Sequence, residues 1–208
     1  MKKVSAIIPA YNEEATIQSV IQVVLESGQI DEVIVVDDGS TDATAKLAGA
    51  SGAKVISIPV NKGKGFALAT GLKHTSHEIA LFVDADLVGL QPHHIAALVN
   101  PVLNREAEMT VGKFQSGEFW TTLSQHITPF LSGQRALQKE AVSGFKNMEQ
   151  LGFGVETALT LFFRKNNLPM KTVPLENLLH VVKERKFGFF RGFYLRMKMY
   201  WQIIRVFF

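Results

Sequence analysis

The sequence contains no cysteine among its 208 residues, which excludes disulfide bonds and thiolate metal sites. It also contains no window of 18 uninterrupted apolar residues, which argues against a membrane-spanning helix. The apolar run after the basic start is short and meets Asn12, Glu13 and Glu14 without a small-residue cleavage site. A signal peptide is therefore not expected, and we predict a cytoplasmic protein.

The composition, 47% hydrophobic and 20% charged, suits one globular domain with a sizeable core. The net charge of +3 is unevenly distributed along the chain. Residues 183–208 hold seven Lys or Arg against a single acid, Glu184, so that a neutral-to-acidic body carries a basic tail. This asymmetry requires a functional explanation.

The first half of the sequence alternates between predicted strands and helices. Ile17, Val20, Ile21 and Val24 follow helical spacing, and Asn12 is a candidate N-cap for that helix. Alternating strands and helices imply crossover connections and a mostly parallel sheet, so we predict an α/β fold. The expected strands are 4–10, 32–36, 54–58 and 79–83, and the further expected helices are 41–51 and 63–74.

The second half is less regular. We expect a helix from Pro92 to about Asn100, and the pattern of residues 119–130 is ambiguous. No internal repeat or linker indicates a second domain. The remaining expected elements are strands at 107–112 and 171–176 and a helix at 155–166.

A polar cluster follows each of the first four predicted strands. In parallel sheets, ligands bind in the crevice beyond the carboxyl ends of the strands. Four such coincidences therefore predict a binding site at this edge. The clusters are PAYNEE, DDGSTD, NKGKG and DADL, in that order along the chain.

Two carboxylates, Asp84 and Asp86, come directly after the buried strand 79–83. Close carboxylates are poorly tolerated unless a cation lies between them or one is protonated. Oxygen ligands suit Mg²⁺ or Mn²⁺, which keep water ligands and use substrate phosphate oxygens. The alternative is that one acid caps the following turn while the other is solvated.

The segment DDGSTD combines a turn with two consecutive acids. Gly39 permits positive φ, and Ser40 or Thr41 can cap the next helix. Capping does not require the acids Asp37 and Asp38, and an acid here could accept a hydrogen bond from a base or a ribose hydroxyl. An ordinary strand-to-helix turn is the alternative.

The segment NKGKG, Asn61 to Gly65, supplies glycines and two lysines at a predicted helix start. Glycines let backbone amides approach a diphosphate, and Lys62 or Lys64 adds positive charge. Its spacing matches neither a Walker A loop nor G-x-G-x-x-G, so ATP hydrolysis and NAD chemistry lose support. A solvated loop is the alternative.

Together these motifs resemble the nucleotide-binding half of family 2 glycosyltransferases with the GT-A fold. The resemblance covers residues 4–100 closely and implies a nucleotide-diphosphate sugar donor, with Mg²⁺ or Mn²⁺ as cofactor. It implies that Lys64 neighbours the diphosphate and that Asp84, Ala85 and Asp86 form a D-x-D metal motif. Its implied nucleotide-sugar contacts also include Pro9, Ala10, Tyr11, Glu13, Asp38 and Gly39.

The second half resembles polyprenyl-phosphate sugar synthases and glucosyl-3-phosphoglycerate synthases more loosely. The segment LSGQRALQKEAV implies sugar and acceptor contacts at Ser132, Gly133 and Arg135. GFGVETAL implies that Glu156 borders the active centre, with a helix-start acid as the alternative. ENLLHVVKE places His180 as a late histidine completing the metal site, with a surface histidine as the alternative.

The predicted organisation is therefore a GT-A domain at residues 1–182, with a nucleotide-binding half at 1–100 and an acceptor half at 101–182, followed by a tail at 183–208. Residues 187–208 contain nine aromatic residues among 22, with interspersed basic residues. That composition predicts a helix lying on an anionic membrane surface, peripheral to the inner face. Packing against the body or a homodimer partner is the alternative, and nucleic-acid binding is not expected because no supporting module accompanies the tail.

The leading functional prediction is metal-dependent transfer of a hexose from a UDP-sugar to a phosphorylated or lipid-linked acceptor. Asp86 would act through the cation, and Glu156 would be the base for an acceptor hydroxyl. A small soluble acceptor, as in glucosyl-3-phosphoglycerate synthases, is one alternative. A nucleotidyltransferase or a non-catalytic nucleotide-binding scaffold are the others.

Overall fold

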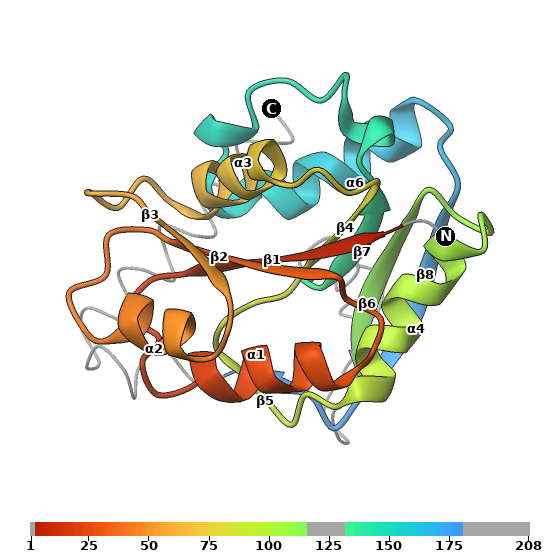
Figure 1. Ribbon diagram of the computed structural model, residues 1–208. Coiled ribbons are helices and arrows are strands. Elements are labelled where there is room, and N and C mark those ends of the chain that lie inside the picture. The colour runs from red at the N-terminus through yellow and green to blue at the C-terminus, as the bar shows by residue number, and fades with distance from the viewer. Residues whose placement is uncertain (1–2, 116–131, 181–208) are drawn as a thin grey trace.

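The computed structural model describes residues 3–115 and 132–180, and its centre is a sheet of seven strands (Figure 1). The strand order across the sheet is β3-β2-β1-β4-β7-β6-β8. Strands β1 to β4 are mutually parallel, β7 is antiparallel to both of its neighbours, and β6 is parallel to β8. The bounds are β1 Val4–Ala10, β2 Glu32–Asp37, β3 Lys54–Ser57, β4 Ile79–Phe82, β6 Met109–Gln115, β7 Arg135–Gln138 and β8 Met170–Glu176.

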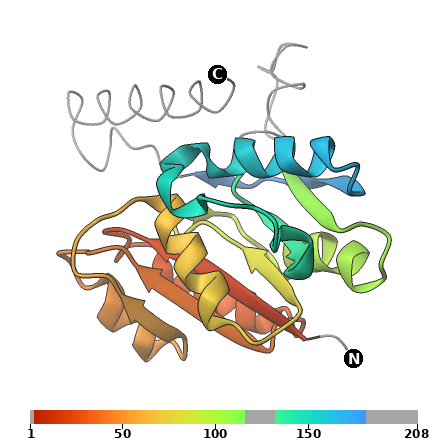
Figure 2. The ribbon, with the colours of Figure 1, turned by 90° about the horizontal axis from the view of Figure 1, so that it is seen from above.

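Helices cover both faces of this sheet (Figures 1 and 2). One face packs against α1 (Ile17–Glu26), α2 (Thr44–Ala50) and α4 (Pro92–Leu103), and the other packs against α3 (Lys64–His74) and α6 (Val155–Lys165). Each face has its own apolar core, and the central strands contribute alternate residues to the two cores, as the period of two in a strand requires. The predicted α/β class is confirmed.

Smaller elements complete the described part. The 3₁₀ turns η1 (Glu140–Val142), η2 (Met148–Gln150) and η3 (Gly152–Gly154) precede α6. A two-stranded antiparallel ribbon joins β5 (Leu87–Val88) to β9 (Leu179–His180). The ribbon pairs the segment just after Asp86 with the segment that contains His180.

The predicted strands and helices that fall on the described residues are present, and the interior residues predicted for α1 are all buried. Helix α4 continues to Leu103, beyond the predicted end at Asn100, although Pro101 lies inside it. A proline removes one backbone donor, but the last turn buries Val102 completely, and that burial favours continuation of the helix. Strands β5, β7 and β9 were not predicted.

Two predicted helix caps are wrong. The N-cap of α1 is Thr16 and not Asn12, and the N-cap of α2 is Ala43 and not Ser40 or Thr41; neither helix has a side-chain cap. Asn12 instead accepts from the amide of Thr41 at 2.8 Å, and Ser40 accepts from the amide of Asn12 at 2.9 Å. These side chains join two loops at the carboxyl edge of the sheet, and that role competes with capping.

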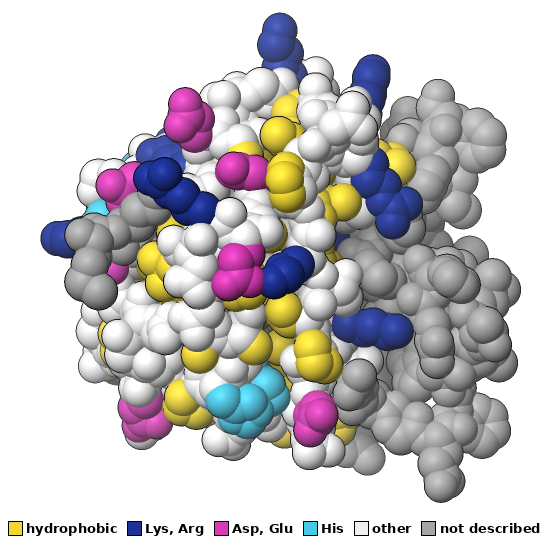
Figure 3. All heavy atoms as spheres, turned by 90° about the vertical axis from the view of Figure 1, so that its right-hand side faces the viewer, with side chains coloured by type: hydrophobic (Ala, Val, Ile, Leu, Met, Phe, Trp, Pro, Cys, Tyr) yellow, Lys and Arg dark blue, Asp and Glu magenta, His cyan; other side chains and the backbone are white. Residues whose placement is uncertain are grey.

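The sheet contains strands from both predicted halves, with β4 and β7 adjacent in it, and the division at residue 100 stays a prediction. Among the helices that the structure describes, none is both long and apolar enough to cross a membrane. The segment 119–130 and the tail predicted at 183–208 lie outside the described residues. On the face over α4 and β8, basic and acidic side chains are interspersed (Figure 3).

Candidate active site

The four polar clusters lie at one edge of the sheet, because β1, β2, β3 and β4 are parallel and each cluster follows a strand. Their loops are bonded to one another. The amide of Glu13 donates to Thr44 Oγ1 at 2.7 Å, which adds to the Asn12–Thr41 and Asn12–Ser40 bonds. The edge is therefore a connected surface rather than a set of independent turns.

Asp38 fixes the loop that leads into α3. Its two carboxylate oxygens accept from the amides of Lys62 at 2.8 Å and Gly63 at 2.7 Å, and the residue is only 4% exposed. Burial raises the pKa of this carboxyl, and the two amide bonds partly oppose that effect. Asp38 therefore holds the start of α3; its predicted contact with a base or ribose stays a prediction.

Gly39 has φ +75°, as the sequence predicted, and a side chain there would also collide with the neighbouring loop. An added Cβ would lie 2.8 Å from the backbone nitrogen of Asn61. The turn after β2 and the loop before α3 can approach this closely only because residue 39 is glycine. Sequence patterns indicated the positive φ but not the close approach.

Lys64, the first residue of α3, lies between two carboxylates. Its ammonium is 2.5 Å from Asp84 Oδ1 and 2.5 Å from Glu156 Oε1. Burial favours the neutral amine, but the negative charges of Asp84 and Glu156 outweigh that effect and raise the Lys64 pKa above the ordinary value for lysine. The sequence predicted that Asp84 and Asp86 hold a divalent metal ion, which stays a prediction; the lysine beside Asp84 is a separate finding of the structure.

Glu156 is in the first turn of α6 and is 6% exposed. The resemblance implied a place at the active centre, and the ion pair with Lys64 brings Glu156 to the same ammonium as Asp84. The alternative of a helix-start acid also describes its position, since acids in the first turn are stabilised by the helix dipole. The catalytic role of Glu156 therefore stays a prediction.

Glycines allow this convergence. A Cβ on Gly133 would lie 2.5 Å from Asp84 Oδ2 and 2.6 Å from Lys64 Nζ, so the backbone before β7 closes directly over the charged pair. A Cβ on Gly65 would collide with the carbonyl oxygen of Met148 and lie 3.1 Å from the nitrogen of Gly152. The start of α3 and the turns before α6 therefore interlock through glycine backbone.

Of the other predicted contacts, Ala10 and Ala85 are buried, at 3% exposure each. Ser132 is also buried, and its hydroxyl donates to Gln134 Oε1 at 3.3 Å. Arg135 lies behind these residues with no exposed surface. Pro9, Tyr11 and Glu13 lie at the end of β1 and in the loop that follows it.

Asp84 and Asp86, the predicted metal ligands, follow the end of β4. Leu87 pairs with His180 in the ribbon, so the backbone of His180 lies beside the residue that follows Asp86. Within residues 3–115 and 132–180, no group of three or more His, Asp or Glu side chains could hold a metal ion. Two carboxylates nevertheless fit Mg²⁺ or Mn²⁺, because these ions keep waters and use diphosphate oxygens.

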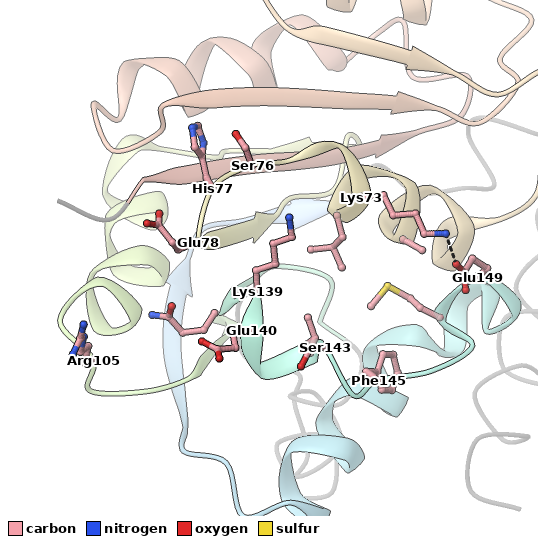
Figure 4. A pocket seen from close by; sticks show the side chains of 15 residues that line it. Lys73, Ser76, His77, Glu78, Arg105, Lys139, Glu140, Ser143, Phe145 and Glu149 are labelled. Carbon is pink, nitrogen blue, oxygen red and sulfur yellow. Dashed lines mark hydrogen bonds and ion pairs between the residues drawn. The ribbon is translucent and has the colours of Figure 1, made fainter.

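The hollow shown in Figure 4, about 900 Å³ in volume, is elsewhere. Ser76, His77 and Glu78 line it just before β4 begins, together with Lys73 at the end of α3 and Lys139 after β7. It therefore lies at the amino end of β4, opposite the motif-bearing edge. We assign the site by the convergence of charged groups and not by the size of this hollow.

Comparison with known proteins gives one family match: the model described as glycosyl transferase family 2 matches residues 5–163. Glucosyl-3-phosphoglycerate synthase of Mycobacterium tuberculosis is 44% identical over 122 residues, which cover 54% of this chain and 38% of that protein. The 4,4′-diaponeurosporenoate glycosyltransferase of Staphylococcus haemolyticus is 33% identical over 104 residues, covering 47% and 28%. These matches thus span well under half the length of the curated relatives.

Among solved structures, the M. tuberculosis synthase in complex with Mn²⁺, uridine diphosphate and phosphoglyceric acid matches with a TM-score of 0.79 and 32% identity. That match covers 99% of this chain and 77% of the synthase chain. The same synthase with Mn²⁺, UDP-glucose and glycerol 3-phosphate matches with a TM-score of 0.74 and 32% identity, covering 86% and 72%. The likeness confirms the predicted GT-A-like arrangement.

Proposed function

Because the chain belongs to glycosyl transferase family 2, we propose that it transfers a hexose from a UDP-sugar to a small phosphorylated acceptor, with Mg²⁺ or Mn²⁺ as cofactor. The observation that carries this proposal is the meeting of Lys64, Asp84 and Glu156 at the carboxyl edge of the sheet. Ligands bind at that edge in parallel sheets, and a lysine there can neutralise a diphosphate.

The donor diphosphate would lie at the start of α3. Asp38 holds the amides of Lys62 and Gly63 in place, and the N-terminus of α3 favours negative charge. Lys64 would turn from its carboxylate partners toward the diphosphate oxygens. The base and ribose would lie against Pro9, Ala10, Tyr11 and Glu13, beside the turn at Gly39.

Asp86 and Asp84 would hold the divalent cation, with the imidazole of His180 as a further ligand. The cation supplies positive charge close to the departing diphosphate. The backbone pairing of Leu87 with His180 supports this set, because it brings the ribbon beside the D-x-D motif.

Glu156 would accept a proton from an acceptor hydroxyl. The ammonium of Lys64 contacts this carboxylate in the structure, at 2.5 Å from Oε1. Movement of Lys64 toward the donor would remove that contact and leave the carboxylate available to the acceptor hydroxyl. An acceptor that attacks through an ionised phosphate would need no base, and Glu156 would then position groups.

A small acceptor is favoured over a lipid-linked one by the relatives, since structures of the M. tuberculosis synthase contain phosphoglyceric acid or glycerol 3-phosphate. A lipid-linked phosphate is the second candidate because of the aromatic, basic tail at 187–208. The two acceptors share a phosphate and differ in the apolar chain.

The test is UDP release from UDP-glucose and other UDP-sugars with Mn²⁺, in the presence of 3-phosphoglycerate, glycerol 3-phosphate or a polyprenyl phosphate. We expect one small phosphorylated acceptor to stimulate release, and Asp86→Asn to abolish the stimulation. Glu106→Gln is the control, because Glu106 is exposed and pairs only with surface groups in the described structure. Stimulation by the polyprenyl phosphate alone would favour the second candidate, and no donor turnover with any acceptor would favour a scaffold.

A further inference from the structure

Arg135, at the start of β7, is the bulkiest of the fully buried side chains in the described structure, with 0% exposure. Burying a guanidinium is costly unless its hydrogen bonds and charge are compensated. Burial lowers the pKa of Arg135 to about 10, while Glu156 and Asp84 oppose this decrease, so the group remains charged at neutral pH. A buried cation next to the candidate site requires an explanation beyond packing.

The hydrogen bonds of Arg135 connect two segments that border the candidate site, the segment before β7 and helix α6. Its Nε donates to the carbonyl oxygen of Ser132 at 2.8 Å, and Ser132 precedes the glycine that closes over Asp84 and Lys64. Its Nη1 donates to Thr160 Oγ1 at 2.8 Å, and that hydroxyl donates to the carbonyl oxygen of Glu156 at 3.0 Å. Arg135 therefore fastens the segment before β7 and the first turn of α6 to one rigid group.

The charges of this centre are also arranged about Arg135. Lys64 contacts both Asp84 and Glu156, and the same two acids interact electrostatically with Arg135, whose pKa they raise. If Lys64 turns toward a diphosphate, Glu156 loses its contact with the ammonium. Arg135 cannot move toward the diphosphate with Lys64, because it is buried and hydrogen-bonded to Ser132 and Thr160. Its positive charge therefore stays in place.

We propose that Arg135 is a positioning residue, which holds Gly133 and Glu156 around the reacting groups and remains as the counter-charge of Glu156 when Lys64 engages the donor. The inference rests on the proposed function and deepens it. It differs from the direct sugar or acceptor contact that the resemblance implied, because Arg135 has no surface that a ligand can reach in this structure. Arg135 acts through Ser132, Gly133, Thr160 and Glu156.

The first test compares Arg135→Met and Arg135→Lys with the wild-type chain, by UDP-sugar binding calorimetry with Mn²⁺ and by turnover. Arg135→Met should lower kcat by about tenfold to 100-fold, with the donor dissociation constant changed by less than about threefold. Arg135→Lys should recover part of kcat, since it keeps the charge. Arg105→Met, an exposed arginine by the distant hollow, is the control and should match wild type.

If the methionine variant does not fold, Arg135→Lys and Thr160→Val carry the test, because the valine removes the link to Glu156 with little change in shape. Both should lower kcat while donor affinity holds. If both variants keep the wild-type kcat, or if donor binding and kcat fall equally, the role proposed for Arg135 is wrong, and the proposed function is unaffected. A wild-type chain that binds no UDP-sugar would overturn the proposed function and this inference together.

A double-mutant cycle gives a readout that does not depend on activity. Arg135→Lys, Glu156→Gln and the double variant are compared by the urea midpoint of unfolding. Coupled groups give a double variant whose midpoint shift differs from the sum of the two single shifts. Additive shifts would show that Arg135 does not act on Glu156, which contradicts the proposal.

Discussion

At the scale of single residues, the site depends on one ammonium placed between two acids. The sequence raised the question of why Asp84 and Asp86 follow a buried strand, and it predicted a divalent metal ion there; the structure adds a lysine. Lys64 contacts both Asp84 and Glu156 and has only 14% of its side chain exposed. Its removal would leave two partly buried carboxylates close together without that positive charge, which is strongly unfavourable.

Lys64→Ala should therefore lower the free energy of unfolding by about 3 kcal/mol, the usual cost of removing one partner of a buried ion pair. Lys73→Ala is a matched control on the same helix: Lys73 pairs with Glu149 at 2.8 Å, but its side chain is 70% exposed. Exposed pairs contribute less than about 1 kcal/mol. Urea unfolding measures both values, and equal losses in the two variants would contradict the buried pairing.

The raised pKa of Lys64 predicts low reactivity toward amine reagents. A lysine whose pKa is raised by folding stabilises the folded state fully at pH values below its pKa in the unfolded chain. This stabilisation is lost only as the pH rises through the pKa of the folded state. Lys64 therefore stays protonated at about pH 9. Labelling at that pH, followed by mass spectrometry, should modify the exposed Lys62 at least about tenfold faster than Lys64. In urea the two rates should converge. Equal rates in the folded protein would contradict the assignment.

Local sequence could predict some of these residues and not others. Asp84 and Lys64 stand at the ends of regular elements, where polar residues after strands and before helices indicate a site. The pairing of Lys64 with Glu156 could not be predicted from local pattern, because it joins α3 to a helix far along the chain. Arg135 was predicted as a ligand contact from the resemblance of its segment to sugar synthases. The local pattern of RALQ does not indicate that the arginine is buried.

At the scale of elements, glycines set the distance between α3 and the turns before α6. Gly65 lies close to Met148 and Gly152. A Cβ added at Gly63 would lie 3.7 Å from the α-carbon of Gly152. The segments GKG and GFG therefore pack backbone against backbone. This close packing brings Lys64 within reach of Glu156.

Gly65→Ala should separate these elements and lower both stability, by about 1 to 3 kcal/mol, and sugar transfer. Gly49→Ala is the control: it lies inside α2, where an added Cβ would be 3.8 Å from Val55, an ordinary contact. There alanine should leave stability unchanged or raise it by up to about 1 kcal/mol. Thermal unfolding distinguishes the variants, and a neutral Gly65→Ala would contradict the interlock.

Elements with a strong pattern could be predicted, and short ones could not. Strands β1, β2 and β4 are runs of buried β-branched or large apolar residues, so their class follows from composition. Strands β5 and β9 have two residues each, too few for any periodicity. Strand β7 is buried yet carries arginine and glutamine, which hides it from a hydrophobicity pattern.

At the scale of the whole molecule, the sequence predicts that the basic, aromatic segment 187–208 binds anionic membrane. The full chain should co-sediment with phosphatidylserine-containing vesicles and not with neutral ones. Replacing Arg191, Arg196, Lys198 and Arg205 by glutamine should abolish the pelleting, because each basic residue contributes about 1 kcal/mol. Equal pelleting of both forms would contradict the membrane prediction and leave packing or dimerisation as the explanation.

The central claim concerns the carboxyl edge of the sheet, where Lys64, Asp84 and Asp86 would receive a metal-bound sugar diphosphate. Calorimetric titration of UDP-glucose into the wild-type chain, with and without Mn²⁺, tests it most directly. We predict uptake of the donor that requires Mn²⁺ and falls by at least about tenfold in Asp86→Asn, the effect of losing one good charged contact. Folded wild-type protein that takes up no UDP-sugar in the presence of Mn²⁺ would contradict the account.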